Sequence, residues 1–122
     1  MSAGPHLKLF NAVNATTTSP LVARADLGDY DVGFSKTNTG TGDLALQTND
    51  VSDQEFAIDP TAGWIQHDMA AATGIVAGKI DVPATNPWTA KVKLTRFRPR
   101  RHRWVFTKTG GTTALSGDVT WE

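Results

Sequence analysis

The stretch RHRWVFTKTGGTTALSGDVTWE, residues 101 to 122, indicates the fold class most clearly. Trp104 and Phe106 fall on one face of its first half and Arg103 on the other, the period-two alternation of a half-buried strand. Two glycines then interrupt the pattern before a second alternating run. We predict two strands joined as a β-hairpin, in which Val119 meets Phe106 across the pair.

The same alternation occurs earlier in the chain. In YDVGFSKT, which begins at Tyr30, the side chains of Tyr30, Val32 and Phe34 share one face. The loop NTGTGD follows, and then the run LALQTND. We predict a second hairpin, in which Leu44 and Leu46 face Val32 and Phe34 across the pair.

Outside these runs, Gly, Thr, Asn and Asp recur as turn residues at short intervals, and no segment sustains the spacing of an amphipathic helix. One helical turn is expected within residues 68 to 73. With 122 residues the chain has the size of one domain. We predict an all-β fold: a single antiparallel β-sandwich over residues 1 to 122, jelly-roll or Ig-like, with seven to nine strands and little helix. Residues 1 to 6 are expected to form an N-terminal arm.

The composition argues against most enzyme and metal-site classes. The chain has no cysteine, which excludes disulfides, thiolate ligands and cysteine nucleophiles. His6, His67 and His102 are far apart and do not have the short spacing of a metal site. No serine lies in a G-x-S-x-G elbow, and no glycine-rich loop opens a helix. We therefore predict no catalytic residue, no cofactor and no metal, and we expect a protein that is not an enzyme.

Four acidic residues leave two alternatives open. In principle they could form a calcium site or the carboxylate pair of a glycosidase, although solvated turn residues are the more common use of such side chains. They are Asp50, Asp53, Glu55 and Asp59.

Charge is strongly segregated along a chain whose formal net charge is zero. Residues 82 to 117 contain eight basic residues and no acidic one, whereas residues 1 to 81 contain four basic and ten acidic residues. Such a chain is suited to contacts between a basic patch and an acidic partner surface. We predict a protein interface at the arginines of the basic stretch, with a plain solvated face as the alternative. They are Arg96, Arg98, Arg100, Arg101 and Arg103.

Nucleic acid is not the favoured partner of these arginines. Aromatic residues do alternate with them, as in proteins that bind single strands. However, Trp104 occupies a core position in the strand pattern, the rest of the chain is acidic, and no nucleic-acid-binding motif accompanies the stretch.

Two tryptophans beside turns suggest another alternative, a glycan-binding module. Trp64 follows TAG and Trp88 follows NP, and an exposed indole at such a place can stack on a sugar ring. The competing interpretation is that all four tryptophans cover the core or its edges.

No stretch has the length of a membrane span, and the N-terminus MSAGPHLKLF has no apolar run of signal-peptide length. We therefore expect synthesis in the cytosol and no membrane association.

The C-terminal unit RWVFTKTGGTTALSGDVTW, residues 103 to 121, resembles a unit of small virion proteins of tailed bacteriophages. Residues 14 to 50, NATTTSPLVARADLGDYDVGFSKTNTGTGDLALQTND, are similar in kind to the opening of such domains. The resemblance implies a non-enzymatic structural protein of the virion, assembled in the bacterial cytoplasm. It implies a capsid decoration protein that docks on the major capsid protein as a trimer or dimer. A tail, neck or fibre subunit is the alternative.

Overall fold

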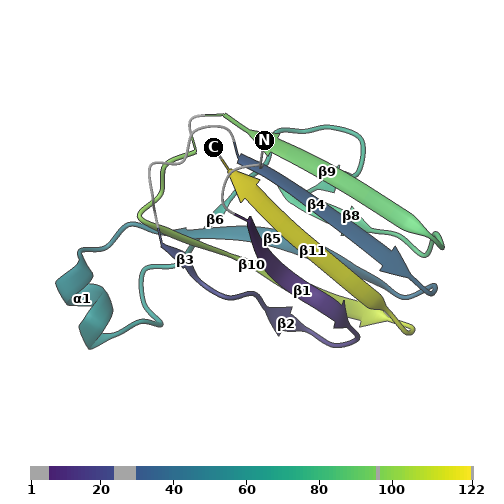
Figure 1. Ribbon diagram of the computed structural model, residues 1–122, viewed down its shortest axis with the longest axis horizontal. Helices are drawn as coiled ribbons and strands as arrows, with labels where there is room; N and C mark the ends of the chain where they lie inside the picture. Colours follow the sequence, from purple (N-terminus) through teal and green to yellow (C-terminus); the bar gives the residue numbers. More distant parts are fainter. Residues whose placement is uncertain (1–5, 24–29, 96, 122) are drawn as a thin grey trace.

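The computed structural model describes residues 6 to 23, 30 to 95 and 97 to 121, which form two antiparallel sheets (Figure 1). Sheet A has the order β1-β11-β4-β9. Sheet B has the order β2-β10-β5-β8-β7, with β3 beside β10 and β6 beside β5. The predicted all-β sandwich is therefore confirmed. Residues 1 to 5 of the expected N-terminal arm lie outside the described residues. The elements are β1 (His6–Val13), β2 (Thr17–Thr18), β3 (Val22–Ala23), β4 (Tyr30–Thr37), β5 (Thr41–Asn49), α1 (Asp53–Ile58), β6 (Ile65–His67), β7 (Ile75–Val76), β8 (Lys79–Val82), β9 (Trp88–Leu94), β10 (Arg101–Gly110) and β11 (Ala114–Trp121).

The strand pairing is nested. β1 pairs with β11, β2 and β3 pair with β10, β4 pairs with β9, and β5 pairs with β8. The chain thus forms one long antiparallel ribbon that reverses direction in the segment between β5 and β8. The ribbon is rolled so that β4 also pairs with β11 and β5 with β10. This arrangement is a jelly roll, which decides between the two predicted kinds of sandwich.

Both predicted hairpins are wrong, although their strands exist. β4 and β11 belong to sheet A, whereas β5 and β10 belong to sheet B, so each glycine-rich turn crosses from one sheet to the other. The two crossings run side by side, and the amide of Gly40 donates to the carbonyl of Thr112 at 2.7 Å. A Cβ atom on Gly40 would lie 2.3 Å from Cγ2 of Thr113, so only glycine fits there. Leu44 and Phe34 therefore join one core from opposite sheets.

The described chain has eleven strands rather than seven to nine. The excess comes from very short strands, because β2, β3 and β7 have two residues each and β6 has three. Runs of this length are too short to show an alternating pattern.

The helical turn expected at residues 68 to 73 is absent, and the helix lies at Asp53–Ile58 instead. The hydroxyl of Ser52 accepts a hydrogen bond from the amide of Glu55 at 3.2 Å, which is an N-cap. Ser52 and Glu55 have the spacing of a capping box. The signal for this helix was therefore present in the sequence.

The core follows the predicted faces. Trp104 and Phe106 are fully buried, as are Tyr30 and Leu44. Lys36 is an exception, because this lysine lies on the buried face of β4 and is only 1% exposed. Its Nζ donates to the carbonyl of Gly40 at 2.6 Å and to that of Pro83, and burial lowers the pKa of Lys36.

Candidate functional site

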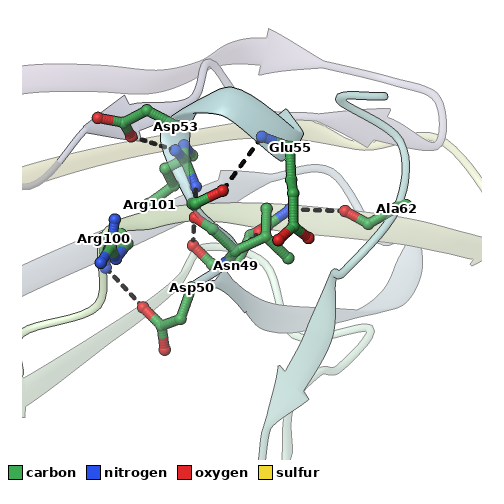
Figure 2. A network of polar contacts seen from close by, with 9 residues as sticks. Asn49, Asp50, Asp53, Glu55, Ala62, Arg100 and Arg101 are labelled. Atoms are coloured by element: carbon green, nitrogen blue, oxygen red, sulfur yellow. Dashed lines mark hydrogen bonds and ion pairs between the residues drawn. The ribbon is translucent and has the colours of Figure 1, made fainter. Parts of the chain in front are cut away.

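The arginine stretch begins at the connection between β9 and β10. Phe97 and Pro99 are buried there, whereas Arg98 and Arg100 are exposed. The backbone amide of Arg100 donates to Oδ1 of Asp50 at 2.7 Å (Figure 2). No ion pair joins Arg98 or Arg100 to another residue of the described chain. We call Arg98 and Arg100 the arginine corner, since the buried neighbours fix the backbone while both side chains face solvent.

Arg101 has a different role, because its side chain is only 6% exposed. It forms an ion pair with the carboxylate of Asp53 in α1, and its Nη1 donates to the carbonyl of Val51 at 2.8 Å. Its guanidinium carbon lies 4.1 Å from the centroid of the Phe56 ring, a cation–π contact. Figure 2 shows Arg101 directed toward α1. Arg101 therefore holds the helix on sheet B.

Arg103 makes a second contact of the same kind. Its Nε donates to Oε1 of Gln47 at 2.7 Å, and its guanidinium carbon lies 4.0 Å from the centroid of the Trp64 ring. Burial lowers the pKa of the Arg103 guanidinium. The side chain of Asn49 also donates to the carbonyl of Ala62, at 2.8 Å (Figure 2). These contacts attach residues 50 to 64, which we call the tip segment, to the outer face of sheet B.

Four of the five arginines of the predicted interface are thus divided into two groups. Arg101 and Arg103 make contacts within the chain, and the arginine corner remains available to a partner. Arg96 lies outside the described residues. The interface therefore stays a prediction, and its accessible part in the described chain is the arginine corner.

The two tryptophans proposed for glycan stacking are both partly buried. Arg103 covers one face of the Trp64 ring, and the indole nitrogen of Trp64 donates to the carbonyl of Pro60 at 3.0 Å. Trp88 packs against the core from β9. Glycan stacking at these residues stays a prediction.

The four acidic residues singled out in the sequence lie in the tip segment, and the carboxylates of three of them have partners. Asp50 accepts from the amide of Arg100, and Asp53 pairs with Arg101. Asp59 accepts from the hydroxyl of Thr61 at 2.6 Å, which lowers the pKa of the Asp59 carboxyl. Across the described ranges, no three His, Asp or Glu side chains gather where they could hold a metal ion.

A buried polar triad in the core was not predicted. Nε1 of Trp104 donates to the Tyr30 hydroxyl at 3.0 Å, and that hydroxyl lies 2.8 Å from Nε2 of His102. Because the indole can only donate, the Tyr30 hydroxyl accepts the hydrogen bond from Trp104. Burial lowers the pKa of His102 to about 4 and raises that of Tyr30. Nδ1 of His102 has no hydrogen-bond partner in the described part of the chain. The alternation that placed Trp104 inside also places His102 inside, so the sequence pattern could have predicted that His102 is buried.

The described residues define a jelly-roll sandwich with an arginine-anchored tip segment and two outward arginines. No protein-family model matches the chain, and no curated protein matches it. Among solved structures 28 chains match. One belongs to "Structure of deformed wing virus carrying the GFP gene", with 7% identity and a TM-score of 0.41, over 99% of this chain and 44% of that chain. This chain therefore spans less than half of the length of that match. None of the helices in the described ranges could cross a membrane.

Proposed function

We propose that the chain is a non-enzymatic structural protein of a virion that docks on a partner through the arginine corner. The observation that carries this proposal is the alternation of buried and exposed residues before β10. Phe97 and Pro99 anchor the backbone, and Arg98 and Arg100 point outward from it. Arginine is enriched in protein interfaces, and a backbone that is already fixed loses less entropy on binding.

The fold is consistent with this role. Double-sheet jelly rolls occur in viral capsid domains and also in lectins and cupins, so the fold alone does not define a function. The resemblance of residues 103 to 121 to small virion proteins of tailed bacteriophages favours the capsid among these. Our specific proposal is a decoration protein of a bacteriophage head that binds the major capsid protein as a dimer or trimer. A tail, neck or fibre subunit is the alternative position.

Charge reversal tests the docking surface. We expect the double variant Arg98→Glu/Arg100→Glu to bind particles stripped of the protein at least tenfold more weakly, because central arginines are frequent binding hot spots. Co-sedimentation of variant and stripped particles at physiological salt measures this. The matched control is Arg98→Lys/Arg100→Lys, which keeps the charge and should lose less affinity for the stripped particles. Unchanged binding of the charge-reversed variant would show that the partner uses another surface.

A further inference from the structure

Sheet A ends in two edge strands that differ in regularity. The register between β1 and β11 shifts twice, between Lys8 and Phe10 and between Phe10 and Val13, and Ala12 has a φ of 52°. Bulges of this kind protect an edge from pairing with other chains. β9, in contrast, pairs with β4 through seven consecutive residues without a shift.

β9 is also the only long, regular edge strand in the described part of the chain. It is the last strand of sheet A, and the edges of sheet B are formed by strands of two or three residues. A regular edge presents unpaired backbone amides and carbonyls that can bind a further strand.

A groove of about 520 Å³ lies next to β9, between its residues 91 to 94 and the segment from His67 to Ile75. Val92 and Leu94 of β9 line one side, and Met69 and Ile75 line the other. Val92, Leu94 and Ile75 are only partly buried. The two sheets therefore leave apolar side chains accessible at this edge.

The outward face of β9 is basic. Lys91 and Lys93 are exposed, and Thr89 lies on the same face. Lys91 stands opposite Gly33 of β4, so no side chain of β4 lies directly across from it, and no ion pair of Lys91 occurs in the described chain. A strand that adds to the free side of β9 would place a residue directly opposite Lys91. Opposite charges across strands are stabilising and like charges are destabilising.

We propose that β9 binds an extended segment of a partner protein in which acidic residues alternate with apolar ones. The segment adds to sheet A as a fifth strand, its apolar side chains enter the groove beside Val92 and Leu94, and its acidic side chains lie next to Lys91. Backbone hydrogen bonds provide affinity in such strand addition, and alternate side chains provide specificity. Pairing of β9 with β9 of a second copy is disfavoured, because it would bring lysines together. The proposal does not depend on the virion role.

The probe is an eight-residue peptide of alternating glutamate and valine, titrated into the full chain and followed through backbone amide chemical shifts. We expect the shift changes to centre on residues 88 to 94. A fully N-methylated peptide of the same sequence cannot donate backbone hydrogen bonds, so it should not bind. A peptide of alternating lysine and valine should bind more weakly because its charge is reversed.

Lys91→Glu should weaken binding of the glutamate peptide about tenfold, since an attractive cross-strand pair becomes repulsive. The matched control is Lys8→Glu on β1, the other edge strand of the same sheet, which should bind as the unmodified protein does. Equal binding of the N-methylated peptide, or shift changes away from β9, would overturn the proposal. Shift changes in β9 that depend on protein concentration without peptide would also overturn it, since they would assign the edge to a second copy.

Discussion

Lowering the pH from 7 to 4 should cost the protein about 3 kcal/mol of stability through His102 alone. The pKa of His102 is lowered by burial to about 4 in the folded chain, whereas an unfolded histidine titrates near 6.5. Between these two values the unfolded chain binds the extra proton, so stability falls as the pH falls. Above pH 6.5 and below pH 4, His102 adds no further pH dependence to the free energy of unfolding.

The cause is the burial of the imidazole in the core. Nε1 of Trp104 donates a hydrogen bond to the Tyr30 hydroxyl, which is also hydrogen-bonded to Nε2 of His102. A protonated imidazole carries a proton on both ring nitrogens, and Nδ1 of His102 has no hydrogen-bond partner in the described chain. The charge would also be buried, since His102 is 0% exposed.

Urea unfolding at pH 7, 5.5 and 4 measures the effect. The loss of unfolding free energy between pH 7 and pH 4 should be about 3 kcal/mol smaller in His102→Gln than in the unmodified chain. Carboxylates titrate in the same range, and for this reason the difference between the two proteins is the quantity to compare. His67→Gln, which removes a partly buried histidine, should lose as much unfolding free energy between pH 7 and pH 4 as the unmodified chain does. A His102→Gln protein that loses as much stability as the unmodified chain would contradict the assignment.

Arg101→Ala should cost about 2 kcal/mol of stability and loosen the tip segment. The substitution removes the ion pair to Asp53, the hydrogen bond to the carbonyl of Val51 and the contact with the Phe56 ring. Asp53 is itself solvent-exposed, so its carboxylate remains hydrated after the change. We therefore expect less destabilisation than the loss of one partner of a fully buried ion pair produces.

Amide hydrogen exchange locates this effect. The amides of Phe56 and Asp59 donate to the carbonyls of Ser52 and Glu55 at 2.9 and 3.0 Å, and both amides should exchange faster in Arg101→Ala. The matched control is Arg98→Ala, which removes an exposed arginine three positions away and should change stability by less than about 0.5 kcal/mol. Unchanged protection of Phe56 and Asp59 would show that Arg101 does not hold the helix.

The faces of the strands could be predicted from the sequence, but their partners could not. Alternation placed Tyr30, Val32 and Phe34 inside correctly, because period two follows from backbone geometry alone. The same pattern is compatible with a turn back into one sheet and with a crossing to the other. The crossing after β4 depends on its contact with Thr112 and Thr113, about seventy residues further along the chain.

Which arginines make contacts within the chain and which stay exposed also depends on long-range contacts. The cluster was visible in the sequence, yet Arg101 and Arg103 could not be separated from Arg98 and Arg100 by composition. Their partners Phe56 and Trp64 lie about forty residues away and reach them only because β5 pairs with β10. The capping box at Ser52 was the local signal that the tip segment contains a helix.

The central claim is that this jelly roll is a structural component of a virion. Gold-labelled antibody against the protein, applied to particles from the source lysate and viewed by electron microscopy, tests that claim directly. We predict label spread over the heads of the particles. Label confined to one vertex or to the tail would contradict the decoration role and favour a connector or fibre subunit, and particles without any label would contradict the virion role itself.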